Sequence, residues 1–180
     1  MSSILVVTGS VRPNSVNEII TPLVAAEAEK QGAEVKVANL KELALPFFDA
    51  PVSPMAPDFA PAHENVIEWT KLVAEADGVI FVTPEYNHTM TPVQLNAIDW
   101  IGKEWEHKKI GLVGYGWNSG AAQAHATARE VLAVNLKAVV GDDQTNLYFT
   151  RELNADGTVA DEAKVTESIA ATVAEVIGEL

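Results

Sequence analysis

Three polar stretches of this sequence carry residue types that bind phosphate groups and planar rings. The first, GSVRPNSVN, covers residues 9–17 and contains a single cation, Arg12. An arginine can make forked hydrogen bonds to phosphate oxygens, and a helix that starts after the stretch would add free backbone N–H groups. The side chains of Ser10, Ser15 and Asn17 can donate further hydrogen bonds. The stretch therefore predicts a phosphate-binding loop, although Ser15 and Glu18 could also form a simple capping box at the start of that helix.

The second stretch, TPEYNHTMTP, covers residues 83–92 and is stiffened by two prolines. Such a loop could direct the backbone N–H groups of Glu85, Tyr86 and Asn87, which follow Pro84, towards the edge of a planar ligand. In the alternative interpretation, the prolines only mark a turn and Glu85 is a solvated charge.

The third stretch, YGWNSGA, covers residues 115–121 and begins at Tyr115. Gly116 and Gly120 permit a close backbone approach or a positive φ, and Trp117 and Asn118 lie between them. The alternative is a glycine turn in which the tryptophan covers the edge of the core.

Expected strands precede all three stretches. Apolar runs at residues 4–8, 78–83 and 110–115 are typical of strands that are buried on both faces. The alternating residues 34–39 predict a strand nearer an edge, and residues 138–140 begin a last strand. Helical patterns separate these strands, so the sequence predicts an α/β fold with a parallel sheet that helices cover on both faces. Ligands bind such sheets beyond the carboxyl ends of the strands, where the three stretches lie.

The expected helices are less uniform than the strands. Helical spacing of apolar residues starts at residue 16, and further helices are expected over residues 62–76, 91–105, 121–135 and 161–177. The segment at residues 40–62 contains five of the nine prolines and has no clear period, which predicts an irregular excursion. No internal repeat or linker divides the chain, so residues 1–180 are expected to form a single domain.

The composition excludes several classes of function. The net charge of −13 disfavours nucleic acid and anionic membranes as partners. No apolar run approaches the roughly 20 residues of a membrane helix. The chain has no cysteine, which excludes disulfides and thiolate metal sites and favours a cytoplasmic location. No metal site is expected, because no pair of histidines or carboxylates has convincing ligand spacing.

Taken together, these residues resemble the NAD(P)H-dependent FMN reductase family of flavodoxin-like proteins, which includes quinone, chromate and azo-dye reductases. The first motif is G-S-x-R-x-x-S-x-N at residues 9–17. The second is P-E-Y-N at residues 84–87, followed by LNAIDW at residues 95–100. The resemblance extends over nearly the whole chain. It departs from the family at Val93, where the family often has glycine, and at Trp117 and Asn118, where the family's third loop has more glycine and serine.

The resemblance implies a three-layer α/β/α sandwich with a five-stranded parallel sheet in the order 2-1-3-4-5. It implies FMN as cofactor and NADPH or NADH as co-substrate, with a quinone, an azo compound, free flavin or an oxyanion as the acceptor. Carried over to this sequence, the FMN-binding residues are Ser10, Arg12, Ser15, Val16, Asn17, Pro84, Glu85, Tyr86, Asn87, Tyr115, Gly116, Trp117, Asn118 and Gly120. The first loop would hold the phosphate and the other two would flank the isoalloxazine ring. No catalytic acid or base is named, because the flavin performs the redox chemistry.

Two other functions fit the same fold. One is a flavodoxin-type electron carrier that does not itself oxidise NAD(P)H, and the other is a non-enzymatic binding module whose third loop excludes flavin. The family also implies a homodimer, which could pair into a homotetramer. The apolar residues of the helix expected at 91–105 spread over more than one stripe, so Trp105 is expected at the subunit interface.

Overall fold

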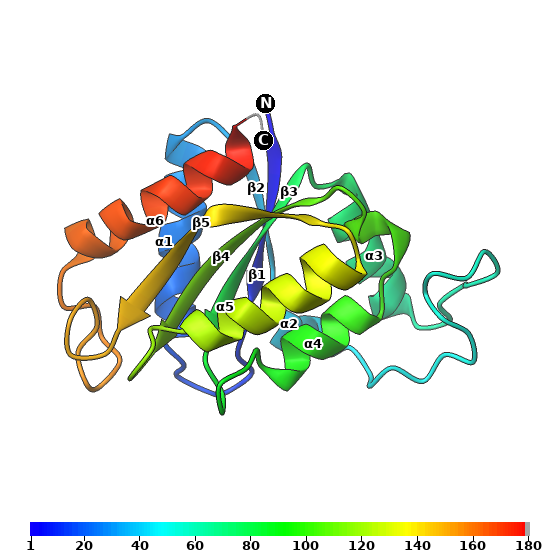
Figure 1. The fold of residues 1–180 in the computed structure, drawn as a ribbon, viewed down its shortest axis with the longest axis horizontal. Coiled ribbons are helices and arrows are strands. Elements are labelled where there is room, and N and C mark those ends of the chain that lie inside the picture. Colours follow the sequence, from blue (N-terminus) through cyan, green and yellow to red (C-terminus); the bar gives the residue numbers. More distant parts are fainter. Residues whose placement is uncertain (179–180) are drawn as a thin grey trace.

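A five-stranded parallel sheet forms the centre of the molecule (Figure 1). The computed structural model describes residues 1–178. In chain order the strands are β1 (Ser3–Thr8), β2 (Glu34–Ala38), β3 (Gly78–Pro84), β4 (Lys109–Gly116) and β5 (Val139–Tyr148). They lie in the order β2-β1-β3-β4-β5, and every neighbouring pair is parallel. The predicted α/β fold and strand order are therefore confirmed.

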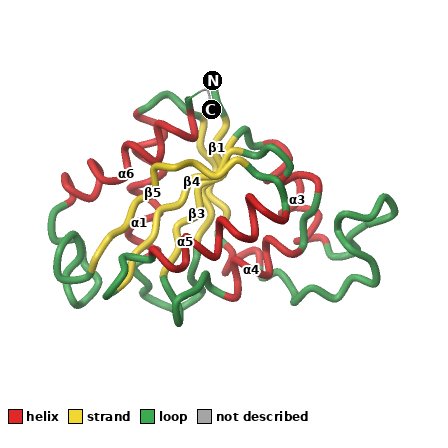
Figure 2. Tube along the Cα trace, in the orientation of Figure 1, coloured by secondary structure: helices red, strands yellow, loops and turns green. Residues whose placement is uncertain are grey.

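Helices cover both faces of this sheet, as Figures 1 and 2 show. Helices α1 (Asn17–Lys30) and α6 (Glu162–Ile177) pack together on one face. The other face carries α3 (Glu64–Glu75), α4 (Pro92–Asp99) and α5 (Ala122–Arg129), with the short helix α2 (Leu40–Leu43) beside α4. Helix α5 continues into a π-helical segment, Glu130–Asn135. None of the described helices combines the length and the apolar character needed to cross a lipid bilayer.

The alternation of side chains along the strands builds two separate cores. In β1, Leu5 and Val7 belong to the cluster under α3 and α4, while Ile4 and Val6 belong to the cluster under α1 and α6. All four side chains are at most 1 % exposed. Successive side chains of a strand point to opposite faces, so an unbroken apolar run requires cover on both faces. This requirement explains why the central strands could be predicted from the sequence.

The helix expected at residues 91–105 is shorter than predicted. Helix α4 ends at Asp99, and Trp105 lies on a separate 3-10 turn, Lys103–Trp105. The break falls next to Gly102, where any Cβ atom would overlap the carbonyl oxygen of Pro54. The apolar residues spread over more than one stripe because the chain turns here.

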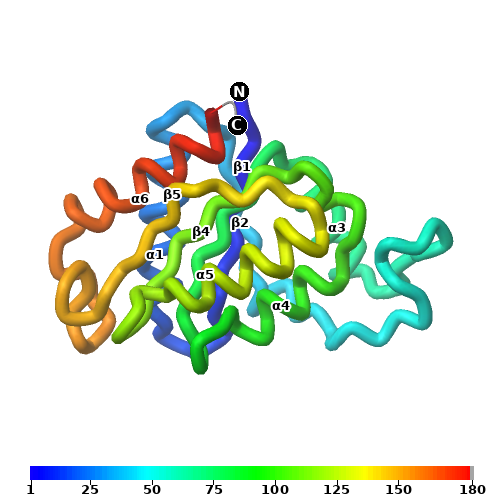
Figure 3. The backbone as a smooth tube through the Cα atoms, viewed as in Figure 1, coloured from blue at the N-terminus to red at the C-terminus, as the bar shows by residue number. Residues whose placement is uncertain are grey.

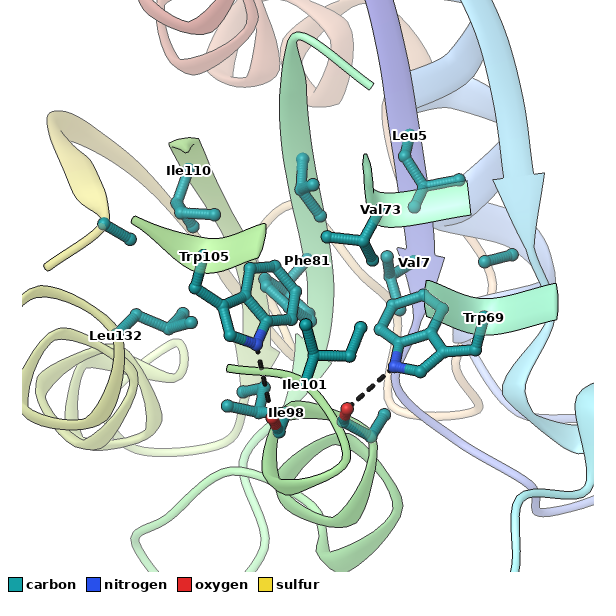
Figure 4. Packing of buried hydrophobic residues seen from close by; sticks show 14 of the residues in the cluster. Leu5, Val7, Trp69, Val73, Phe81, Ile98, Ile101, Trp105, Ile110 and Leu132 are labelled. Atoms are coloured by element: carbon teal, nitrogen blue, oxygen red, sulfur yellow. Dashed lines mark hydrogen bonds between the residues drawn. The ribbon is translucent and has the colours of Figure 1, made fainter. Parts of the chain in front are cut away.

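Trp105 is consequently a core residue, and the expectation that it lies at a subunit interface is wrong. Its side chain is 0 % exposed, and its indole N–H donates to the carbonyl oxygen of Ile98 at 3.2 Å. Its ring lies 6.2 Å from that of Trp69 in α3 and 6.0 Å from that of Phe81 in β3 (Figure 4). The sequence pattern correctly indicated burial, but the covering residues come from the same chain.

The irregular excursion expected at residues 40–62 begins later than predicted, because Leu40–Leu43 form α2. Residues 44–63 contain no helix or strand and extend away from the sheet as a long arm (Figure 3). The arm is tied to α4, because Pro46 accepts hydrogen bonds from the side chains of Asn96 and Trp100 at 2.8 Å each. Beyond this anchor, Phe47 is 81 % exposed. The arm thus presents an aromatic side chain that nothing in residues 1–178 covers.

Candidate functional site

A cleft of about 350 Å³ lies at the carboxyl ends of β1, β3, β4 and β5. Most of the predicted ligand-binding residues line it: Ser10, Arg12, Ser15, Val16, Pro84, Glu85, Tyr86, Tyr115, Gly116 and Trp117. The predicted residues that do not line it are Asn17, Asn87, Asn118 and Gly120. The structure adds residues that the sequence analysis missed: Asn14, Phe149, Ala155, Asp156 and Gly157. Three loops that are distant in sequence therefore meet in one cleft, and a fourth loop joins them.

The first loop is held against β3 by Asn17, which begins α1 and is 1 % exposed. Its side-chain oxygen accepts from the N–H of Gly9 at 2.8 Å, and its amide nitrogen donates to the carbonyl oxygen of Val82 at 2.9 Å. The same nitrogen lies 3.3 Å from the hydroxyl of Tyr115. These contacts occupy the Asn17 side chain inside the protein, so only its backbone N–H could reach a phosphate. The expectation that the side chain of Asn17 donates a hydrogen bond to the phosphate is therefore wrong.

The rest of the first loop has the donor set that a phosphate requires. Ser15 Oγ is buried without a hydrogen-bond partner among the described residues. Within residues 1–178, no acceptor is found for the backbone N–H groups of Asn14, Val16 and Asn17 at the N-terminus of α1, whereas the N–H of Ser15 belongs to a turn over residues 12–15. Arg12 is the one cation among the residues that line the cleft, and it forms no ion pair within the described chain. A buried orphan hydroxyl, free N–H groups and a guanidinium together fit a phosphate monoester such as that of FMN.

The capping box expected from Ser15 and Glu18 is not formed. Helix α1 has no side-chain cap, and Ser15 contacts Glu18 only through its carbonyl oxygen, which accepts from the Glu18 N–H at 3.0 Å. An uncapped helix start beside an orphan hydroxyl favours the ligand-binding interpretation over the capping interpretation.

Glu85 in the second loop is a structural carboxylate. One of its oxygens accepts from Ser119 Oγ at 2.6 Å, and the other accepts from the N–H groups of Gln123 and Ala124 at 3.0 and 3.2 Å. Burial opposes ionisation of Glu85, but these hydrogen bonds outweigh it and hold the pKa of the carboxyl below its ordinary value. Glu85 therefore caps the N-terminus of α5 and ties the second loop to the third, and it is not a solvated charge.

The backbone of the second loop is also largely committed. The N–H of Glu85 donates to the carbonyl oxygen of Tyr115, and Tyr86 and Thr89 exchange two backbone hydrogen bonds of 3.1 Å. Between them, Asn87 and His88 have φ values of 49° and 64°, as in a type I′ turn. The expectation that the N–H groups of Glu85 and Tyr86 face a ligand is therefore wrong. Asn87 serves the turn, and Tyr86 lines the cleft although its N–H is bonded to Thr89.

The third loop contributes a floor and a rim to the cleft. Tyr115 is 4 % exposed, and burial raises the pKa of its phenol, so it stays protonated. Gly120, with a φ of 57°, lies so close to Tyr148 that a Cβ atom would stand 2.9 Å from its ring. Gly120 thus shapes the turn without lining the cleft, and the side chain of Asn118 is exposed to solvent. Trp117 remains at the rim.

The fourth loop follows β5. Phe149 donates its N–H to the carbonyl oxygen of Gly116 at 3.2 Å, which brings the loop beside the third one. Gly157, with a φ of 89°, packs against Val16. The residues NADG at 154–157 are typical of a turn, but only the position of β5 next to β4 brings that turn to the cleft.

His125 lies behind the third loop and is not suited to proton transfer at neutral pH. It is 0 % exposed and packs against Gly114. Burial, with a smaller contribution from the charge of Arg129, lowers the pKa of its imidazole to about 4. The ring is therefore neutral at pH 7.

Comparison of the sequence with known proteins identifies relatives of this chain. Residues 2–150 match the family described as NADPH-dependent FMN reductase. The chain is 28 % identical over 176 residues to the NAD(P)H-dependent FMN reductase ntnL of Nectria sp, covering 91 % of this chain and 86 % of that protein. It is 28 % identical over 168 residues to a 2-hydroxy-1,4-benzoquinone reductase of Burkholderia sp, covering 88 % and 86 %.

A solved structure of another protein has the same fold. FerB, a flavoenzyme NAD(P)H:(acceptor) oxidoreductase from Paracoccus denitrificans, superposes with a TM-score of 0.73 at 24 % identity, covering 98 % of each chain. At that identity the likeness concerns the fold, which is flavodoxin-like as predicted. The family match over most of the chain goes further, and the chain belongs to the NADPH-dependent FMN reductase family of oxidoreductases.

Proposed function

We propose that this protein binds FMN in the cleft at the carboxyl end of the sheet. The observation that carries the proposal is the first loop, in which Arg12, the orphan hydroxyl of Ser15 and the free N–H groups of Asn14, Val16 and Asn17 lie together at a helix start. These groups would hold the phosphate, with Ser10 and Val16 beside them. The second loop, through residues 84–86, and the third loop, through residues 115–117, would flank the isoalloxazine ring.

The proposed reaction is the transfer of a hydride from NADPH or NADH to a small acceptor by way of the flavin. Bound FMN would supply the redox chemistry by taking up the hydride and passing two electrons on. For a quinone the sum balances as NAD(P)H plus H⁺ plus quinone giving NAD(P)⁺ plus quinol, with the proton supplied by solvent. Azo compounds, free flavin and oxyanions are further acceptors within the proposal. The proposal also includes a cytoplasmic location for the protein.

The protein's own contribution is binding and orientation. Arg12 and the first loop fix one end of the cofactor, and Glu85 holds the second and third loops together through α5. Tyr115 and Phe149, whose rings meet edge to face at 6.3 Å, form an apolar wall that reduces the access of water.

A reconstitution experiment tests the proposal. FMN is added to the flavin-free protein, and the complex is mixed anaerobically with NADPH or NADH in a stopped-flow spectrometer. We expect the visible flavin absorbance to disappear in a single turnover and to return when 1,4-naphthoquinone is added. Bound flavin that neither nicotinamide reduces would indicate an electron carrier, and failure to bind FMN would indicate a binding module of another kind.

We also propose that the protein is a homodimer, which could pair into a tetramer. Trp105 lies in the core and gives no support to a dimer. Support comes instead from the arm at residues 44–63, where Phe47 is 81 %, Met55 39 % and Phe48 37 % exposed. Large apolar side chains gathered on one exposed segment are typical of a protein-binding surface.

Replacing Phe47 with aspartate is expected to shift the protein from dimer to monomer at micromolar concentration, because a buried unpaired charge is costly at an interface. Sedimentation velocity measures the change. Val134→Asp is the matched control, since Val134 is 65 % exposed on the π-helical segment and lies outside the arm. A wild-type protein that sediments as a monomer would contradict the proposal.

A further inference from the structure

Trp117 differs from the other tryptophans of the chain. Trp69, Trp100 and Trp105 are at most 1 % exposed, whereas Trp117 is 58 % exposed at the rim of the cleft. A large aromatic surface left in water forgoes the free energy that its burial would release. The position of Trp117 therefore calls for an explanation other than packing of the core.

The indole of Trp117 is nevertheless held in a defined orientation. It stacks on Phe149 with ring centroids 4.8 Å apart and an interplanar angle of 20°. Phe149 is itself fixed, because its N–H bonds to Gly116 and its ring meets Tyr115 edge to face. One face of the indole is covered by Phe149, and its exposure shows that much of the remaining ring surface is open.

We propose that Trp117 is a specificity-determining residue that selects planar aromatic acceptors by stacking. The inference rests on the proposed flavin-dependent function and names the class of acceptor for the same cleft. A planar acceptor would extend the pair formed by Trp117 and Phe149 into a stack of three rings. Because Phe149 already orients the indole, binding would cost little additional ordering of the side chain.

The charges around the cleft favour a neutral acceptor of this kind. Its lining contains one cation, Arg12, and two acidic residues, Glu85 and Asp156. If Arg12 holds the FMN phosphate, the remaining charged side chains are acidic, in a chain of net charge −13. An oxyanion would therefore be a poorer acceptor than a quinone or another uncharged planar ring, and the inference narrows the proposed acceptors to the second class.

Two substitutions separate stacking from bulk. Trp117→Leu keeps an apolar side chain but removes the ring, and Trp117→Phe keeps a ring. For each variant, kcat/KM is measured with NADPH for 1,4-naphthoquinone, which is planar, and for ferricyanide, which is octahedral and cannot stack. We expect Trp117→Leu to lower the ratio of the two kcat/KM values by about three- to tenfold, chiefly through KM for the quinone. Trp117→Phe should restore most of the ratio.

A binding measurement provides a readout without turnover. 1,4-Naphthoquinone is titrated calorimetrically into the oxidised protein in the absence of nicotinamide. The dissociation constant of the quinone should rise in Trp117→Leu by about the same factor as the kinetic ratio falls, and the dissociation constant of FMN should rise by less.

Three results would overturn the inference: equal losses with both acceptors, equal behaviour of the leucine and phenylalanine variants, or a loss of FMN affinity as large as that of quinone affinity. The last result would place Trp117 in the cofactor socket. If the wild-type protein binds no FMN and reduces neither acceptor, the proposed function itself fails and the inference fails with it. A wild type that reduces both acceptors, with variants that keep the ratio, refutes only the role of Trp117.

Discussion

Replacing Arg12 with alanine will weaken FMN binding by about 10- to 150-fold, which corresponds to about 1.5–3 kcal/mol for a hydrogen bond to a charged group. The effect should be large because Arg12 is the one cation lining the cleft of a chain with a net charge of −13. Without it, the phosphate would be held by neutral donors alone, against the repulsion of the surrounding acidic surface.

Riboflavin provides the control for this prediction, because it lacks the phosphate. Titration of both flavins should show that Arg12→Ala affects riboflavin far less than FMN. Arg151→Ala is a matched variant: Arg151 lies 4.6 Å above the ring of Tyr148 and does not line the cleft, so its loss should leave the preference for FMN unaltered. Equal weakening of FMN and riboflavin in Arg12→Ala would show that the phosphate is bound elsewhere.

Replacing Asn17 with alanine is expected to lower the free energy of unfolding by about 2–4 kcal/mol. The substitution strips a buried acceptor from the N–H of Gly9 and a donor from the hydroxyl of Tyr115. It also removes a donor from the carbonyl oxygen of Val82, which keeps one hydrogen bond from Gln94 at 3.2 Å. Each buried polar group left without a partner costs about 1–3 kcal/mol.

Urea unfolding followed by circular dichroism measures this loss. Asn118→Ala is the matched control, since it removes the same side chain from an exposed position and should change stability by less than about 0.5 kcal/mol. If Asn17→Ala were as stable as the wild type but had lost affinity for FMN and not for riboflavin, the side chain would have to act directly on the phosphate.

Local patterns were sufficient to predict the strands and most of the helices, whereas the strand order came from the family resemblance. The strands containing Val6, Phe81 and Leu112 are continuous apolar runs, and such runs arise only when both faces of a strand are covered. Residues 91–105 were harder to predict. Helical spacing indicates which side chains are buried, but it does not indicate what buries them, and the turn at Gly102 directs Trp105 into its own core.

The candidate cleft was predictable from the sequence only in part, as the fold was. The loop proposed to bind a phosphate was apparent in the sequence, because one cation, two serine hydroxyl groups and a helix start follow one another within nine residues, and local backbone geometry presents them together. The hydrogen bonds by which Asn17 and Glu85 hold the loops in place were not apparent. Their partners include Val82 and Ser119, which are 65 and 34 residues away in the sequence. Such hydrogen bonds exist only after the strands have aligned.

The sequence by itself thus determined the fold class, the order of the elements and the loop that is suited to a phosphate, since each depends on the burial pattern or chemistry of neighbouring residues. Only the tertiary structure decided that the loop after β5 lines the cleft and that Phe149 orients Trp117. The physical reason is that β5 pairs with β4, which brings together residues about 30 positions apart whose types carry no local sign of the contact.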